Sequence, residues 1–263
     1  MAMSLMPLLF HFPLLPFVHC LFPLRDLSAI RNAKNSPYEG GNLSYEVGDS
    51  KESVMSNRRA LLNAMAPLGL KTFYDLHQVH GDTLLFDPFE GCSQENDLAT
   101  LPIDADGLAT DKANIGLFIK TADCQPLLIT DKKGDYLLAL HIGWRGNKSR
   151  FIKKAVQSFT EHYKLKAQDL MAVRGPSLGT GKAEFVNFRQ EWPEDFAPWY
   201  DPKTQTMDLW NLTRTQLMEA GLEEQAIFSL DLCTMSLPTL FSYRRDRICG
   251  RLGGIIWKEQ KLS

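Results

Sequence analysis

One cysteine and one histidine lie on neighbouring segments whose pattern would bring them together. Cys124 comes just before an apolar segment and His141 lies near the end of the next, with the polar turn Asp131-Lys-Lys-Gly134 between them. If Lys132 and Lys133 form the turn of a hairpin, Cys124 lies directly opposite His141 on one face. A thiolate and an imidazole placed in this way can bind one metal ion, or they can act as nucleophile and base.

A third metal ligand would have to come from the other histidines, of which there are few. The chain contains six histidines, and His77 and His80 lie together shortly before a strand-like segment. Residues three apart share a face on a helix but point in opposite directions on a strand, so the spacing does not choose between them. Two histidines and one cysteine would form a three-ligand zinc site with an open fourth position, which is typical of catalytic zinc.

The elements that would position these residues follow one another irregularly along the chain. Hydrophobic periodicity predicts helices at residues 54–65, 148–162 and 209–220. Short apolar segments predict strands at residues 84–86, 117–120, 127–130, 136–141, 170–174 and 254–257. Because strands and helices are mixed without regular alternation, we expect an α+β fold, a single-domain α/β sandwich that spans residues 1–263.

Composition and charge argue against several classes of protein. A formal net charge of −2 and a pI near 6.3, without a long basic segment, argue against binding to nucleic acid. Prolines interrupt the apolar N-terminal segment and no basic segment precedes it, so we expect neither a signal peptide nor a membrane span. The five cysteines are widely spaced and form no Cys-x-x-Cys pair, which indicates a reducing compartment. We therefore expect a cytoplasmic monomer without nucleic-acid or membrane partners.

The histidines also argue against a multi-copper oxidase. Such an enzyme needs many histidines, several of them in His-x-His pairs, whereas this chain has six histidines and no such pair. A single site with mixed nitrogen and sulfur ligands suits zinc better than a copper cluster.

Several blocks of the sequence resemble the YfiH family, which is also called the laccase-domain, multicopper polyphenol oxidase-like or purine nucleoside phosphorylase-like family. The blocks extend over most of the chain and include residues 40–49, 78–81, 105–111, 121–126, 141–146, 175–179 and 241–246. The resemblance implies mixed β-sheets flanked by helices. It also implies that the histidine immediately before a glycine, His80, is the third ligand, so that zinc would be bound by His80, Cys124 and His141.

The resemblance further implies which reactions and partners to expect. The activities of the family are phosphorolysis of adenosine, methylthioadenosine and inosine-type nucleosides, and hydrolytic deamination of adenosine. The partners would then be a purine nucleoside and phosphate. Asp123, beside Cys124, is the candidate proton carrier or ligand-orienting group. The candidate contacts to base or ribose are Asn42 and Gln78, and the candidate contacts to phosphate or ribose are Arg25, Arg58, Arg145 and Arg251, since a guanidinium group matches such oxygens.

Two other functions remain open from the sequence. In the first, Cys124 is a nucleophile activated by His141 in a hydrolase that needs no metal. The resemblance to the family implies an amide bond as its substrate, such as those of peptidoglycan precursors. In the second, the chain is a non-catalytic metal-binding or interaction protein. Stoichiometric zinc would favour the zinc enzyme over the thiol hydrolase. A non-catalytic protein would turn over neither nucleosides nor peptidoglycan precursors.

Overall fold

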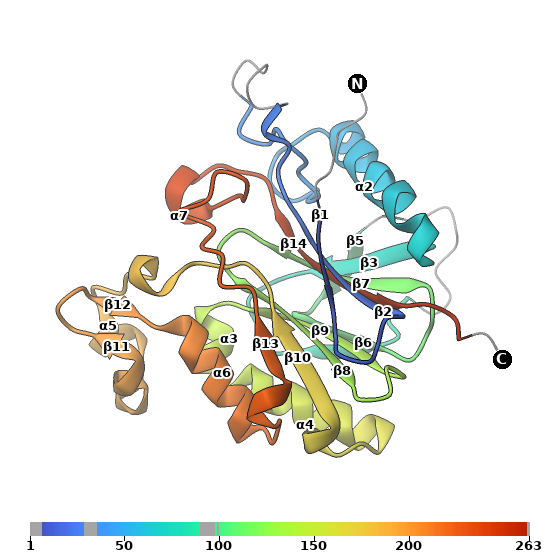
Figure 1. Ribbon diagram of the computed structural model, residues 1–263. Helices are drawn as coiled ribbons and strands as arrows, with labels where there is room; N and C mark the ends of the chain where they lie inside the picture. Colours follow the sequence, from blue (N-terminus) through green and yellow to red (C-terminus); the bar gives the residue numbers. More distant parts are fainter. Residues whose placement is uncertain (1–6, 29–35, 90–97, 99, 262–263) are drawn as a thin grey trace.

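Two six-stranded β-sheets packed face to face form the centre of the molecule (Figure 1). The structure is a computed structural model that describes residues 7–28, 36–89, 98 and 100–261. In spatial order, the first sheet consists of β1 (Pro7–His11), β2 (Val18–Pro23), β14 (Leu252–Lys258), β7 (Ile115–Thr121), β3 (Thr72–His77) and β5 (Thr100–Asp104). The second consists of β13 (Ile227–Ser229), β10 (Leu170–Arg174), β8 (Gln125–Asp131), β9 (Leu137–Ile142), β6 (Gly107–Thr110) and β4 (Leu84–Phe86).

Both sheets contain parallel and antiparallel pairs. In the first sheet, β3 is parallel to β5 and to β7, whereas β14 is antiparallel to β2 and to β7. In the second sheet, β4 is parallel to β6 and β13 to β10, and the central pairs are antiparallel. The predicted sandwich with mixed sheets is confirmed. A further small sheet is formed by β11 (Tyr200–Asp201) and β12 (Thr206–Met207).

Hydrophobic side chains fill the space between the two sheets and the space beneath the helices. Leu117 of β7 and Leu128 of β8 belong to the cluster between the sheets and are completely buried. Every residue of β8 and β9 is buried, and this burial explains why these strands have nearly continuous apolar sequences. Helix α2 covers the outer face of the first sheet, and α4 and α6 cover the second (Figure 1). The helices are α2 (Lys51–Met65), α3 (Trp144–Lys148), α4 (Phe151–Tyr163), α5 (Phe188–Glu191), α6 (Leu209–Glu219) and α7 (Tyr243–Asp246).

Two of the three predicted helices are confirmed, and the third is divided. The predicted helix at residues 148–162 is in fact the end of α3 followed by α4. The two helices are separated at Arg150, whose φ of 56° lies in the left-handed region. A residue in that conformation cannot continue a right-handed helix, so the chain changes direction there. As a result α3 is a separate short helix that directly follows β9.

The hairpin of β8 and β9 has a longer loop than the sequence predicted. The Asp131 carboxylate accepts hydrogen bonds from three backbone N–H groups of the following loop, and these bonds hold a wide turn. His141 therefore faces Pro126, not Cys124. The predicted opposition of Cys124 and His141 is wrong by two residues. A shift of two residues keeps every side chain on its original face, so Cys124 and His141 still project from the same side.

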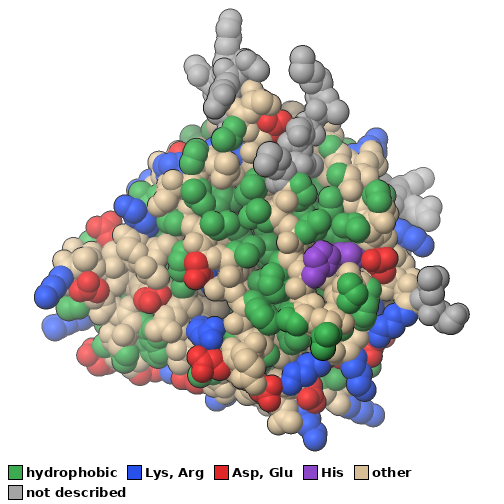
Figure 2. Space-filling view, viewed as in Figure 1, with side chains coloured by type: hydrophobic (Ala, Val, Ile, Leu, Met, Phe, Trp, Pro, Cys, Tyr) green, Lys and Arg blue, Asp and Glu red, His purple; other side chains and the backbone are tan. Residues whose placement is uncertain are grey.

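The N-terminal segment forms β1 and β2, an antiparallel hairpin at one edge of the first sheet. Figure 2 shows hydrophobic side chains gathered in the middle of the face on which this hairpin lies. Leu9 of β1 and Leu14 of the connecting turn are 42% and 95% exposed. Among the described residues, no helix is long and apolar enough to cross a membrane.

A buried ion pair ties α2 to the first sheet. The Arg58 guanidinium donates hydrogen bonds of 2.7 and 3.1 Å to the two carboxylate oxygens of Asp75, and both side chains are fully buried. The Lys120 ammonium group lies 2.8 Å from the same carboxylate. Burial alone raises the pKa of Asp75, but the charges of Arg58 and Lys120 and their hydrogen bonds outweigh it and lower this pKa. Arg58 is therefore a structural residue, and the predicted phosphate or ribose contact is corrected.

Candidate metal centre and cavity

His80 is held in a tight turn that follows β3. Its φ of 59° is left-handed, and the turn is fixed by the fully buried carboxylate of Asp106. The backbone N–H groups of Val79, His80 and Gly81 donate to this carboxylate at 3.3, 3.0 and 2.6 Å. The turn thus projects the His80 ring toward the segment between β7 and β8.

Cys124 lies in that segment, immediately before β8. The preceding residue, Asp123, has a φ of 104°, and both of its carboxylate oxygens accept hydrogen bonds of 2.6 Å. The donors are the Thr234 hydroxyl and the backbone N–H of Arg244, which belong to the C-terminal part of the chain. Of the two roles that the sequence left open for Asp123, these bonds agree with the orienting one, because they fix the backbone next to Cys124.

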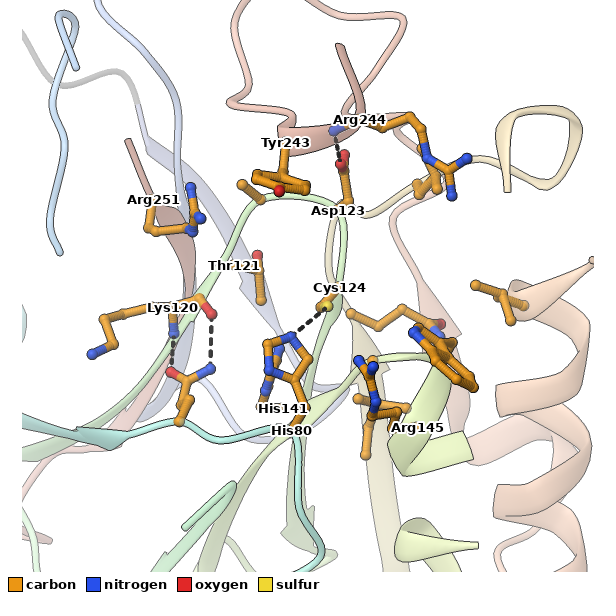
Figure 3. A pocket seen from close by; sticks show the side chains of 18 of the residues that line it. His80, Lys120, Thr121, Asp123, Cys124, His141, Arg145, Tyr243, Arg244 and Arg251 are labelled. Atoms are coloured by element: carbon orange, nitrogen blue, oxygen red, sulfur yellow. Dashed lines mark hydrogen bonds between the residues drawn. The ribbon is translucent and has the colours of Figure 1, made fainter. Parts of the chain in front are cut away.

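His141 completes the group from β9. Its Nδ1 lies 2.6 Å from Oδ1 of Asp106, and its backbone N–H donates to the Asp106 carbonyl at 2.8 Å. The His80 and His141 rings meet edge to face with centroids 4.7 Å apart. The sulfur of Cys124 lies 3.9 Å from Nε2 of His80, and one ligand atom from each of the three residues lies within 4.8 Å of the others (Figure 3).

These three donors fit a zinc ion. Zn–S and Zn–N bonds of about 2.3 and 2.0 Å sum to about 4.3 Å, so one ion can span the gap of 3.9 Å between sulfur and imidazole nitrogen. The hydrogen bond from Nδ1 of His141 to Asp106 leaves Nε2 as the ligand atom, as in carboxylate–histidine–zinc arrangements. His77 does not join the group, because its Nδ1 bonds to Asp104 at 2.7 Å at the cavity margin.

The charges of the site determine how Cys124 and His141 ionise. Burial raises the pKa of the Cys124 thiol, but the nearby His141 imidazolium and the hydrogen bonds from both histidines outweigh burial and lower this pKa. Burial lowers the pKa of His141, but the Cys124 thiolate and Asp106 outweigh burial and raise it. Cys124 is therefore poised as a thiolate, which is the form that binds metals and acts as a nucleophile.

Asp106 is the residue that the sequence did not reveal as part of the site. It bonds to His141 and to the His80 turn, and so it sets the relative positions of two ligands. The only signal was an Asp-Gly pair within one of the blocks that resemble the YfiH family. An Asp-Gly pair usually marks a turn, and so it did not distinguish a buried carboxylate.

The three ligands lie at the wall of a cavity of about 760 Å³. Its other walls combine aromatic and cationic side chains. The aromatic residues are Trp144, Phe185 and Tyr243, and the cationic ones are Lys120, Arg145, Arg244, Arg247 and Arg251. Figure 3 shows Arg251 and Arg145 on opposite sides of the contact between His80 and Cys124. Such a cavity suits a ligand that has both a flat ring and a negative charge.

Three of these cations form no ion pair with any described residue. Arg145 lies over the Trp144 ring at 4.5 Å, and Arg247 lies 5.9 Å from the Tyr243 ring. Arg251 donates to the backbone carbonyls of Cys249 and Gly250. By contrast, carboxylates already neutralise Lys120 and Arg244. The unpaired guanidinium groups are the better candidates for binding an anion.

The structure divides the predicted substrate contacts into two groups. Gln78, Arg145 and Arg251 line the cavity, although the Gln78 amide also bonds to both the N–H and the carbonyl of Lys120. Arg25, Asn42 and Arg58 are not among the lining residues. The Arg25 guanidinium bonds to backbone carbonyls of Glu39 and Pro238, and the fully buried Asn42 bonds to Ser44, Asp49 and Arg251. For these three residues the prediction is corrected, because their polar groups are used within the fold.

Gly143 directly precedes α3, and because it has no side chain, Cys124 and His80 can lie close to its backbone. A Cβ atom at Gly143 would lie 3.1 Å from the Cys124 sulfur and 3.2 Å from Cδ2 of His80. Its φ of −83° is open to any residue, so a side chain here is limited only by this tight contact, which would displace the two ligands by a few tenths of an ångström. We expect Gly143→Ala to lower zinc affinity about 10-fold or more while the protein stays folded.

The measurement is a zinc titration against a chromophoric chelator, with circular dichroism of the same samples. Gly146→Ala is the matched control, because a Cβ there would meet its nearest atom at an ordinary 3.7 Å. Equal zinc affinity in the wild type and in Gly143→Ala would contradict the assignment of this corner as a metal site.

Comparison with known proteins places the chain in a family. A family model described as multi-copper polyphenol oxidoreductase laccase matches residues 28–259. The chain belongs to this family. This match confirms the resemblance to the YfiH family noted in the sequence. Proteins named YfiH are among the relatives of this chain.

Relatives in this family are named purine nucleoside phosphorylases. The Xylella fastidiosa protein of that name is 31% identical over 92% of this chain and 93% of its own length. The Mycobacterium tuberculosis purine nucleoside phosphorylase Rv2149c is 30% identical over 85% of this chain and 86% of its own length. Among solved structures, a Neisseria meningitidis protein has a TM-score of 0.77 and 25% identity over 97% of this chain and 99% of its own. YlmD from Geobacillus stearothermophilus, with a TM-score of 0.78 and 23% identity over 94% of each chain, shares the fold.

Proposed function

We propose that this protein is a zinc-dependent purine nucleoside phosphorylase that acts on adenosine and methylthioadenosine and also deaminates adenosine. The observation that carries the proposal is the convergence of His80, Cys124 and His141 at the wall of a cavity that also presents unpaired guanidinium groups. The names of the relatives support the choice of purine nucleoside and phosphate as substrates.

The residues of the metal site have separate tasks in this proposal. His80, Cys124 and His141 would hold zinc, and zinc bound by three protein ligands supplies a Lewis acid with one open position. Asp106 keeps Nδ1 of His141 protonated, so that Nε2 is free to bind the metal. The family description names copper, but six histidines without a His-x-His pair, and the N/S site that the described residues form, suit zinc better.

The cavity wall would position phosphate against the sugar. Arg145, Arg247 and Arg251 line the cavity, carry positive charge without a carboxylate partner among the described residues, and would bind the phosphate oxygens. In phosphorolysis, a phosphate oxygen forms a bond to C1′ of the ribose as the C1′–N9 bond breaks, and the base leaves with the bonding electron pair and is protonated. In deamination, water adds to C6 of adenine and ammonia leaves. Holding the two reactants together supplies much of the rate enhancement in either reaction.

The test is mass spectrometry of the products formed from adenosine by the zinc-loaded protein, with and without phosphate. Adenine with ribose 1-phosphate would establish phosphorolysis, and inosine would establish deamination. Both products should be missing with Cys124→Ala, whose folding is checked by circular dichroism. Lack of conversion of adenosine and methylthioadenosine by the zinc-loaded wild type would refute the proposal.

One observation favours a second candidate function. Cys124, His141 and Asp106 form a chain of thiolate, imidazolium and carboxylate, which is the arrangement of a Cys–His hydrolase. Such an enzyme would cleave an amide bond, as in peptidoglycan precursors, without metal. Metal-free protein that hydrolyses the amide, and loses this activity when iodoacetamide alkylates Cys124, would support the hydrolase. Stoichiometric zinc needed for nucleoside turnover would exclude it as the main activity.

A further inference from the structure

Gln125 carries a buried amide for which the fold supplies no partner. It is the first residue of β8, directly after Cys124, and it is only 2% exposed. Neither its Nε2 nor its Oε1 has a hydrogen-bond partner among the described residues. Most buried side-chain polar atoms in proteins are paired, so an amide with both groups unpaired calls for an explanation.

The position of Gln125 connects this amide with the cavity. On β8, Gln125 pairs with Ile142 and shares a face with Leu127 and Ile129, which pack beneath α4 and α6. Its side chain is therefore on the opposite face of the strand from Pro126, the residue that pairs with His141. Gln125 nevertheless lines the same cavity, together with residues at the starts of α3 and α6 and on the segment after β10; these are Trp144, Leu209 and Leu178.

The residues that line the cavity are of two chemical kinds. The zinc ligands and the cationic side chains are of one kind, and Trp144, Leu178, Leu209 and Gln125 are of the other. The first kind suits phosphate and ribose. The second, once the Gln125 amide is turned toward the cavity, suits a flat, largely apolar group that presents a hydrogen-bond donor beside an acceptor, because a carboxamide offers one of each. A purine base with a polar group at C6 has this pattern at C6 and the adjacent ring nitrogen.

We propose that Gln125 determines base specificity by binding the C6 substituent and N1 of a purine nucleoside. This inference rests on the proposed function and deepens it. Adenine presents an amino donor and a ring-nitrogen acceptor, whereas hypoxanthine presents a carbonyl acceptor and an N–H donor. A half-turn of the carboxamide exchanges its own donor and acceptor, so Gln125 accepts 6-amino and 6-oxo purines alike. Because both amide atoms are covered in the free protein, the side chain turns toward the base as the base enters.

Replacing the amide by an apolar group of similar shape tests this role. Gln125→Met keeps the length of the side chain and removes both unpaired polar atoms. We expect KM for adenosine and inosine in the presence of phosphate to rise roughly 10- to 100-fold, the range set by loss of one bidentate amide–base pair. KM for purine riboside should change less than about 3-fold. This base has only hydrogen at C6, so it cannot form the hydrogen bond between the C6 substituent and the Gln125 amide.

A second measurement separates recognition from a structural role. Because the amide is unpaired in the free protein, we expect Gln125→Met to unfold at the same or a higher urea concentration than the wild type. Leu127→Met, on the same face of β8, is the control for repacking and should leave the ratio of KM for adenosine to KM for purine riboside unchanged. Gln125→Leu serves as a second apolar variant.

The outcomes distinguish this inference from the proposed function. If the wild type converts adenosine but Gln125→Met has the same ratio of KM for adenosine to KM for purine riboside as the wild type, Gln125 does not recognise the base. Only the inference is then overturned. If both Gln125→Met and Gln125→Leu unfold at a lower urea concentration than the wild type, the amide has a structural role. This result would also overturn the inference. If the wild type converts no nucleoside, the proposed function fails and the inference falls with it.

Discussion

Replacing Asp106 with asparagine is expected to lower zinc affinity 10- to 100-fold and to reduce nucleoside turnover in parallel. The carboxylate accepts hydrogen bonds on both oxygens, from His141 and from the backbone of the His80 turn. An amide replaces one acceptor by an NH₂ donor. If that donor faces Nδ1 of His141, the ring must carry its proton on Nε2 and cannot bind metal through that atom. If it faces the turn instead, it opposes the N–H of Gly81 and displaces His80.

Zinc competition titration and product analysis of the same protein preparation measure this effect. Asp104→Asn is the control, because Asp104 is 71% exposed and bonds only to His77 at the cavity margin, according to the described contacts. Asp106→Asn that binds zinc as tightly as Asp104→Asn would refute the role of Asp106 in orienting the ligands. A general unfolding of Asp106→Asn would appear in circular dichroism, and Asp106→Glu, which keeps the charge, should then recover part of the zinc binding.

Replacing Asp75 with asparagine is expected to destabilise the fold by about 3–5 kcal/mol, a large part of the 5–15 kcal/mol that is usual for a domain. The carboxylate of Asp75 is bonded to Arg58, Lys120 and Thr100, and none of it is exposed. Its loss leaves the fully buried Arg58 guanidinium without a counter-charge. Urea denaturation followed by circular dichroism measures the change in free energy of unfolding.

The same carboxylate makes stability depend on pH in a definite direction. Because the folded state lowers the pKa of Asp75, the stabilisation is complete above the ordinary carboxyl pKa of about 4 and is lost as the pH falls through the lowered value. The wild type should therefore lose stability below about pH 4 more steeply than Asp75→Asn. Asp82→Asn, which removes an exposed pair with Lys154, should cost less than about 1 kcal/mol. Similar losses in Asp75→Asn and Asp82→Asn would contradict the importance of the buried pair.

The sequence was informative about the metal ligands because strand alternation tolerates an error of two residues. Cys124 and His141 were predicted on one face and remain there, although the Asp131 loop moves the register. The choice of His80 over His77 needed the resemblance, since it depends on a left-handed turn that Asp106 creates from a distant part of the chain. No local pattern reveals such a contact.

The substrate contacts were harder to predict because an arginine looks the same in sequence whether it binds a ligand or a buried carboxylate. Arg58 meets Asp75, and Arg145 lies against Trp144 in the cavity, and only the packing of α2 and α3 separates the two cases. The strand prediction succeeded at β8, β9 and β10, which are buried throughout, but it missed β2 and β6, which are also buried throughout. It also missed β3 and β5, whose short mixed sequences carry little periodicity.

The placement of β14 has a consequence for how the protein is made. This strand lies between β2 and β7 in the middle of the first sheet, yet it comes last among the strands in the chain. During synthesis, β2 and β7 therefore emerge from the ribosome long before their shared neighbour does, and each has an open edge until then. The cavity beside β7 can reach its final shape only after the last strand is in place. A nascent chain of this protein should depend on chaperones, and removal of residues 252–258 should give an insoluble product.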